Sequence, residues 1–164
     1  MRAVFDPNVI ISALLSPTGS PVRALQAWAE GRFELIVSPI LLAELERALA
    51  YPKLRRRIAA GEAERVVAWL GRSATVSSDP DRPPPVRSVD PGDDYLLALA
   101  RAEDALLVSG DDHLLTLGGE LPIHSPTSFL ALLEEIDPWR RDAPWRTAVT
   151  RARRGSLGFR DGRE

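Results

Sequence analysis

The stretch that decides the fold is the chain's opening, residues 1–8, which reads MRAVFDPN. A short apolar strand runs directly into Asp6, and Pro7 and the apolar run Val9-Ile10-Ile11 follow at once. Buried strands of parallel sheets have this composition, and open α/β sheets bind their ligands at the carboxyl ends of such strands. A simpler interpretation is that Asp6 only caps a helix beginning at Pro7, which is the commoner outcome for such a dipeptide. The functional interpretation therefore depends on the acidic residues that follow.

The composition is that of one domain with a hydrophobic core. The chain has 164 residues, of which 45% are hydrophobic, and this is enough for a single core. It contains no cysteine, which excludes disulfides, a thiolate nucleophile and a Cys-ligated zinc site. Asp6 would interrupt the apolar centre of a secretory signal, and no run approaches the ~18 apolar residues of a membrane span. We expect a soluble, cytoplasmic protein with no membrane partner.

Positive charge is concentrated at the end of the chain. Residues 137–164 contain eight Arg and four acidic residues, whereas residues 1–136 contain thirteen basic and nineteen acidic ones. We therefore expect a domain over 1–136 and an Arg-rich C-terminal appendage over 137–164, either disordered or partner-binding. The Arg residues of the appendage, interleaved with Trp139 and Trp145, could stack on bases. An ordinary solvated tail is the commoner explanation of such a composition.

Strands alternate with helices along the first 136 residues. Beyond the opening strand, further strands are predicted over 33–37, 74–77, 105–108 and 121–124. Helices are predicted over 8–15, 21–30, 39–50, 54–60, 62–72, 93–104 and 127–136. The proline-rich stretch 79–92 should be a stiff surface connection. This alternation predicts an α/β fold, a three-layer α/β/α sandwich around a central, mainly parallel sheet of about five strands.

Acidic residues recur where this fold would bring them to one edge of the sheet. Asp6 and Asp111 each follow an apolar strand, so both belong at its carboxyl edge. Asp93 and Asp94 begin the predicted helix 93–104. At about 100° per residue, Asp93 lies in line with the apolar face of that helix, whereas Asp94 points about 130° from the centre of the face. Asp93 is therefore the better candidate of the two.

The predicted helix 39–50 offers one more acid, but its periodicity does not identify which. Glu44 and Glu46 lie on opposite borders of the apolar stripe, so both remain open. Each candidate also has an ordinary explanation: Glu44 as a solvated border residue, Asp93 as an acid at a helix start, Asp111 as a turn residue. Four converging carboxylates would nevertheless raise one another's pKa unless a cation lay between them. Oxygen ligands without Cys or His suit Mg²⁺ or Mn²⁺ rather than Zn²⁺.

Four motifs of this chain resemble those of the PIN-domain ribonucleases. They are VFDPNVIISAL at 4–14, SPILLAEL at 38–45, DPGDDYLLALA at 90–100 and LVSGD at 107–111. All four occur in the family's order, and the predicted closing helix 127–136 also fits. The likeness is strongest to the toxin components of bacterial toxin–antitoxin pairs. The resemblance implies a PIN-like, Rossmann-type fold and a metal-dependent nuclease.

The resemblance also implies which residues form the site. The catalytic and metal-binding residues would be Asp6, Glu44, Asp93 and Asp111. The tie between Glu44 and Glu46 is thereby settled for Glu44, and Asn8 and Ser109 gain supporting roles, to which we add Asp94. The family frequently has Thr where this chain has Pro7 and Ser109. Ser109 keeps the hydroxyl, whereas Pro7 loses both a hydroxyl and a donor beside the site.

The expected activity is Mg²⁺- or Mn²⁺-dependent endonucleolytic hydrolysis of RNA. The metal would activate a water and neutralise charge at the phosphate, so no side-chain nucleophile is needed. We expect His113 and His124 to be surface or strand-end residues. Because acidic residues repel RNA, basic groups such as Arg55, Arg56 and Arg57 would have to bind it. The expected partners are RNA, a cognate antitoxin and a second copy of the chain.

Other proteins with acids at a sheet edge fit less well. Receiver domains and aspartyl-phosphate phosphatases need a lysine late in the chain, and the single lysine here is Lys53. The phosphatases also need a second Asp at the position of Asn8. Flap-type DNA nucleases carry helical insertions for which this chain has no room. The remaining alternative is a catalytically weak PIN-like scaffold that binds protein or RNA.

Overall fold

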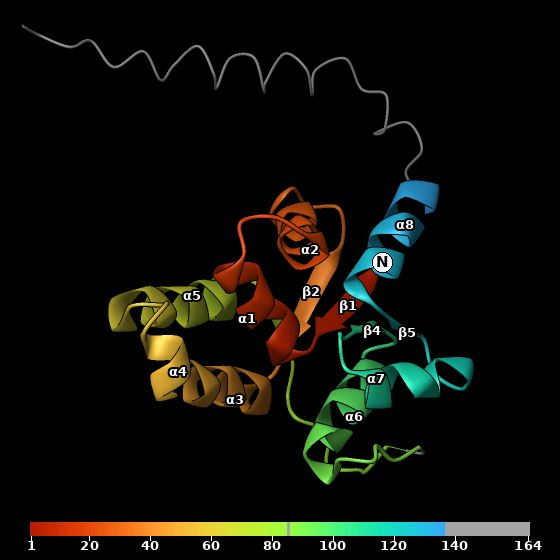
Figure 1. Cartoon of the computed structure of the whole chain (residues 1–164). Coiled ribbons are helices and arrows are strands. Elements are labelled where there is room, and N and C mark those ends of the chain that lie inside the picture. The colour runs from red at the N-terminus through yellow and green to blue at the C-terminus, as the bar shows by residue number, and fades with distance from the viewer. Residues whose placement is uncertain (85, 137–164) are drawn as a thin grey trace, which may run out of the picture. The chain divides into compact units, whose positions relative to one another are not determined.

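A computed structural model describes residues 1–84 and 86–136 and contains a five-stranded, all-parallel sheet flanked by helices (Figure 1). The strand order is β3-β2-β1-β4-β5. The strands are β1 (Arg2–Phe5), β2 (Glu34–Val37), β3 (Thr75–Val76), β4 (Leu106–Val108) and β5 (Ile123–His124). All five were predicted, and the α/β fold class with a central sheet of five strands is confirmed.

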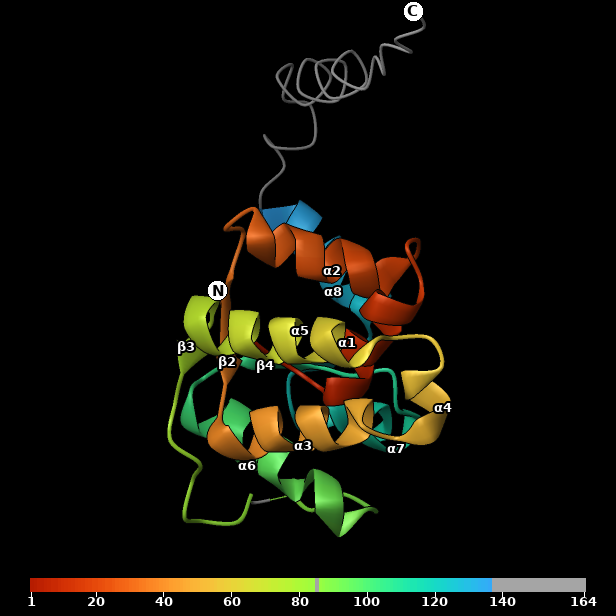
Figure 2. The ribbon, with the colours of Figure 1, turned by 90° about the vertical axis from the view of Figure 1, so that its left-hand side faces the viewer.

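All of the helices except α8, which follows β5, lie in the connections between the strands (Figure 2). The α-helices are α1 (Pro7–Leu15), α2 (Ser20–Ala29), α3 (Pro39–Leu49), α4 (Pro52–Arg55), α5 (Ala60–Ser73), α6 (Asp94–Ala102), α7 (Asp112–Leu115) and α8 (Pro126–Ile136). Two 3-10 helices are η1 (Pro91–Asp93) and η2 (Thr116–Gly119). The helix predicted over 54–60 is wrong in its bounds, because α4 ends at Arg55 and the chain turns to bury Ile58 before α5. Neither α7 nor η2 was predicted, since so short a helix has no periodicity to detect.

The central strand β1 ends beside β4 at the same edge of the sheet. Phe5 pairs with Val108 in parallel register, and the Asp6 amide donates to the Val108 carbonyl oxygen at 3.0 Å. One residue past the end of β4, the Ser109 amide donates to the His124 carbonyl oxygen at 3.0 Å. Asp6 and Ser109 are therefore adjacent at the carboxyl edge of the sheet, although they belong to distant parts of the chain.

Two helices begin at this edge immediately after their strands. Asp6 caps α1 by accepting a hydrogen bond from the Asn8 amide, and Ser38 caps α3 by accepting one from the Leu41 amide. Pro7 and Pro39 occupy the first helical position in each case, where the missing N–H costs nothing. In both places a capping residue followed by proline turns the chain from strand to helix. Helices α1 and α3 therefore both begin at this edge of the sheet.

An aromatic cluster fixes the position of β1. Phe5 lies 5.6 Å from Phe33 and 5.7 Å from Phe129 between ring centroids, and Phe33 lies 4.9 Å from Phe129. The two contacts of Phe129 are edge-to-face, a geometry that aromatic pairs favour. Phe5 is 1% exposed, so the residue immediately before Asp6 is held within the core.

The chain separates into two compact units, Met1–Ala131 and Leu132–Glu164. The second unit is described only as far as residue 136. The predicted Arg-rich appendage 137–164 lies outside the described residues, and the predicted boundary at 136 remains a prediction. Within the described part of the chain, none of the helices is long and apolar enough to cross a bilayer.

Candidate functional site

Asp6 is a buried carboxylate whose two oxygens both accept hydrogen bonds. The residue is only 4% exposed. The backbone amide of Asn8 donates to Oδ1 at 2.8 Å, and the Ser109 hydroxyl donates to Oδ2 at 2.6 Å. Burial raises the pKa of Asp6 and the two hydrogen bonds oppose it, while the carboxylates of Glu44 and Asp111 add to the rise. Asp6 is therefore both a helix cap and part of a group of acids.

Ser109 connects Asp6 to the loop that carries Asp111. The serine is completely buried. Besides donating to Asp6, its Oγ accepts a hydrogen bond from the Asp111 amide at 3.0 Å. Asp111 in turn caps α7, because its Oδ1 accepts from the His113 amide at 2.7 Å. The turn interpretation of Asp111 is correct, and the same turn brings it to the sheet edge beside Asp6.

Asp93 lies at the end of η1, directly before α6, and is partly buried. Burial and the neighbouring carboxylates raise the pKa of Asp93 to about 6. The carboxylates that act on it are, in decreasing order, those of Asp6, Asp90, Asp111 and Glu44. The other three predicted site acids are thus close enough to add to the rise in the pKa of Asp93 that burial causes, as like charges without a cation between them should do. We call Asp6, Glu44, Asp93 and Asp111 the carboxylate cluster.

The chemistry of the carboxylate cluster fits a hard divalent cation. Four carboxylates with neither thiol nor imidazole are ligands of the type that Mg²⁺ and Mn²⁺ prefer. A cation would also relieve the repulsion that raises the pKa of Asp93. Within residues 1–84 and 86–136, however, no three metal-ligating side chains are close enough to hold one ion between them. Direct ligation by three or more of these acids would therefore require side-chain movement, or bridging waters.

Glu44 reaches the cluster from α3. It is partly buried and acts on both Asp6 and Asp93, whereas Glu46 is exposed. Its near neighbour on α6 is Tyr95, where burial and then Glu44 raise the pKa of the phenol. The Tyr95 hydroxyl oxygen is buried and makes no well-formed hydrogen bond with any described residue, although hydrogen bonding to Glu44 contributes to that rise. We did not predict a role for Tyr95, although it directly follows the two acids of the third motif.

Asp94 is buried, even though its helical angle directs it away from the apolar face of α6. The Ser88 amide donates to its Oδ1 at 2.8 Å, and Arg87 Nη1 donates to its Oδ2 at 2.6 Å. The Arg87 hydrogen bond is the main reason that the pKa of Asp94 is lowered. The proline-rich connection folds back over the first turn of α6 and covers this carboxylate, which helical periodicity cannot foresee. Asp94 therefore anchors the connection rather than joining the carboxylate cluster.

The remaining predicted residues are not members of the carboxylate cluster. Asn8 contributes its amide to Asp6, while its side chain is exposed. Arg57 donates to the Leu15 carbonyl oxygen at 3.1 Å and so ties α4 to the end of α1. The other two predicted RNA-binding arginines, Arg55 and Arg56, are exposed on and just after α4. The two histidines behave as expected, with His113 exposed and His124 at the end of β5.

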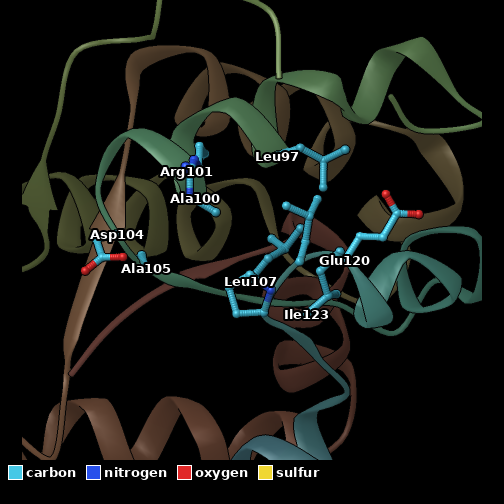
Figure 3. A pocket seen from close by; sticks show the side chains of 10 residues that line it. Leu97, Ala100, Arg101, Asp104, Ala105, Leu107, Glu120 and Ile123 are labelled. Atoms are coloured by element: carbon cyan, nitrogen blue, oxygen red, sulfur yellow. The ribbon is translucent and has the colours of Figure 1, made fainter. Parts of the chain in front are cut away.

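A cavity of about 80 Å³ lies between α6, β4 and the segment leading into β5 (Figure 3). Its lining is mainly apolar and includes Leu97, Leu107 and Ile123, with Arg101 and Glu120 among the charged residues. None of the four acids of the carboxylate cluster lines it. The cavity is therefore separate from the candidate site.

Comparison with known proteins assigns the family. The family model for the PIN domain matches residues 2–113. The uncharacterized protein MJ1680 of Methanocaldococcus jannaschii is 30% identical over 148 residues, which cover 83% of this chain and 94% of that protein.

Solved structures with a similar fold include two VapBC complexes. VapBC2 from Rickettsia felis, bound to a DNA fragment from its promoter, has a TM-score of 0.55 at 14% identity over 76% of this chain and 98% of that one. VapBC-1 from nontypeable Haemophilus influenzae has a TM-score of 0.54 at 15% identity over 77% of this chain and 99% of that one. These likenesses agree with the fold, and the extent of the family match shows that the chain belongs to the PIN domain family.

Proposed function

We propose that this protein is a Mg²⁺- or Mn²⁺-dependent endoribonuclease and the toxin of a toxin–antitoxin pair. The observation that carries the proposal is the carboxylate cluster, in which burial and, after it, repulsion by neighbouring carboxylates raise the pKa of Asp93 to about 6. Such an arrangement of acids is unfavourable by itself and becomes favourable once a cation binds. Perturbed acids grouped at the carboxyl edge of a parallel sheet are typical of functional sites.

The cluster residues would hold the metal, directly or through water. A bound divalent ion lowers the pKa of a coordinated water and offsets charge at the scissile phosphate. The chain's own contribution is orientation: Ser109 and the Asn8 amide fix both oxygens of Asp6. Burial of Asp6 also strengthens its attraction for a cation, because the local dielectric constant is low. The chain has no cysteine, and this chemistry requires none.

RNA would bind through basic side chains outside the acidic cluster. Arg55 and Arg56 are exposed near α3, the helix that carries Glu44, and are the proposed phosphate contacts. The toxin role is supported by family membership and by the similar folds of VapBC complexes and of FitAcB from Neisseria gonorrhoeae, which has a TM-score of 0.50. A cognate antitoxin, a second copy of the chain and a cytoplasmic location belong to this proposal.

A catalytically weak scaffold that binds protein or RNA is the alternative function. It is favoured by the spacing of the acids, since no three ligating side chains of the described residues are poised around one ion. In that case the PIN fold would persist as a binding surface.

Cleavage of RNA tests the proposal against this alternative. Purified protein is incubated with a mixed RNA pool in Mg²⁺, Mn²⁺ or EDTA, beside Asp6→Asn and Asp93→Asn. Glu46→Gln is the matched control, because Glu46 is an exposed acid on the same helix as Glu44. We expect cleavage with metal, none in EDTA, loss in both aspartate variants and full activity in the control. Equal activity in Asp6→Asn, or cleavage that EDTA does not stop, would contradict the proposal.

A further inference from the structure

Tyr95 carries a buried hydroxyl for which the described structure provides no hydrogen bond. A buried hydroxyl without a partner loses its bonds to water and gains nothing in return. Phenylalanine would fill the same space without that cost, so an unpaired tyrosine hydroxyl calls for a functional reason. The residue lies in the first turn of α6, whose start is fixed by the hydrogen bonds that Asp94 accepts. Its position beside the carboxylate cluster is therefore well defined.

Three carboxylates act on this hydroxyl: Glu44 most strongly, then Asp6 and Asp93. Asp6 acts on the hydroxyl less strongly than Glu44 does, and its two oxygens already accept hydrogen bonds from Asn8 and Ser109. Asp93 acts on the hydroxyl more weakly still. It lies only two positions earlier in the chain, and side chains two apart on a helix do not face each other. Glu44 is therefore the best candidate for the acceptor, and it lies on a different helix, α3.

Glu44 also differs from the cluster acids that accept backbone hydrogen bonds. Asp6 and Asp111 each accept at least one hydrogen bond. The Glu44 carboxylate is near enough to the Tyr95 hydroxyl for hydrogen bonding to raise the pKa of the phenol, but the two groups do not meet the geometry of a formed bond. The Tyr95 hydroxyl and the Glu44 carboxylate thus lie next to each other without a well-formed bond between them. A small side-chain movement would pair them.

We propose that Tyr95 is a positioning residue for Glu44: its hydroxyl donates to one Glu44 oxygen as the cluster closes around a divalent cation, and the other oxygen is left to face the ion. This inference rests on the metal-dependent function proposed above. The phenol does not touch the ion. It holds a ligand in one orientation, as outer hydrogen-bond partners of metal ligands generally do.

The test compares two phenylalanine variants of the full chain. Tyr95→Phe removes only the hydroxyl, and Tyr51→Phe is a matched control because Tyr51 is the other tyrosine of the chain and is 58% exposed. Two quantities are measured for each variant: the thermal midpoint in EDTA, and the Mn²⁺ dissociation constant by calorimetry. For Tyr95→Phe we expect an unchanged or higher midpoint in EDTA, together with an approximately tenfold weaker affinity for Mn²⁺. For Tyr51→Phe we expect neither value to change.

A double-mutant comparison shows whether Tyr95 acts through Glu44. In a Glu44→Gln background, Tyr95→Phe should cause little further loss of Mn²⁺ affinity, because the carboxylate that it positions is gone. An equal loss in both backgrounds would overturn the inference, as would wild-type affinity in Tyr95→Phe or a large fall of its midpoint in EDTA. If the wild-type chain itself binds no Mn²⁺, the proposed function fails and the inference fails with it. That result is distinct from failure of the inference alone.

Discussion

The Ser109 hydroxyl donates a hydrogen bond to Oδ2 of Asp6 at 2.6 Å, although 103 positions separate the two residues in the chain. The parallel register of β1 and β4 makes this bond possible, because it pairs Phe5 with Val108 and aligns the two strand ends. The same hydroxyl accepts from the Asp111 amide. One buried serine therefore sets the relative positions of two acids of the carboxylate cluster.

Replacing Ser109 by alanine should weaken both the fold and the site. The Ser109→Ala variant leaves a buried Asp6 oxygen and the Asp111 amide without their partner, which should lower the free energy of unfolding by about 1–3 kcal/mol. Urea unfolding at neutral pH measures this loss. Ser12→Ala, at an exposed position of α1, is the control and should change little. Identical unfolding curves for Ser109→Ala and the wild type would show that the hydrogen bond contributes nothing.

The raised pKa of Asp93 makes the stability of the metal-free protein depend on pH. The folded chain holds the proton of Asp93 up to a pKa of about 6, above the ordinary value of 3.8. The free energy of unfolding should therefore fall as the pH rises from about 4 to about 6, since the unfolded chain releases that proton earlier.

The variant Asp93→Asn should remove this part of the pH dependence. In EDTA it should have a higher thermal midpoint than the wild type at pH above about 6, and the difference should shrink towards pH 4. Thermal unfolding across this range measures both profiles. Parallel profiles, with a constant difference at every pH, would mean that Asp93 does not have the raised pKa.

Asp94 should be a structural residue whose loss loosens the proline-rich connection. The Asp94→Ala variant leaves the buried Ser88 amide without an acceptor, and we expect a loss of about 1–3 kcal/mol in the free energy of unfolding. Arg87→Ala should cost less, within about 1 kcal/mol, because the Arg87 side chain is 62% exposed. Chemical denaturation of both variants gives the comparison. A larger effect at Arg87 than at Asp94 would contradict this account.

Arg55 and Arg56 should contribute to RNA affinity without changing metal binding. In an Asp6→Asn background that cannot cleave, replacing both by alanine should weaken binding of single-stranded RNA. It should also reduce the slope of log affinity against log salt by about 1.4, because each lost phosphate contact removes about 0.7. Filter binding at several salt concentrations measures the slope. An unchanged slope would exclude these two arginines as phosphate contacts.

Most of the fold could be predicted because the strands and long helices are patterned in the sequence. The carboxyl ends of the strands then placed Asp6 and Asp111 at one edge. Glu44 could not be separated from Glu46 by periodicity, since both border the apolar stripe of α3, and the resemblance to a family was needed.

Other features depend on contacts between distant segments and could not be predicted locally. The burial of Asp94 results from the connection folding over α6, and a helical angle describes only the helix itself. The unpaired hydroxyl of Tyr95 depends on how closely α3 approaches α6. The spacing of the carboxylates, too wide for three of the described side chains to share one ion, is likewise a tertiary property.

The central claim is that the carboxylate cluster binds a divalent metal, and calorimetric titration of the full chain with Mn²⁺ tests it most directly. Titrations at pH 6 in buffers of different ionisation enthalpy also report the protons released on binding. We predict saturable binding that releases about half a proton from Asp93 at pH 6, since that pH lies at its pKa, and much less at pH 8. Binding should be strongly weakened in Asp6→Asn and Asp93→Asn. The absence of Mn²⁺ binding by folded wild-type protein, or equal binding by both variants, would contradict the claim.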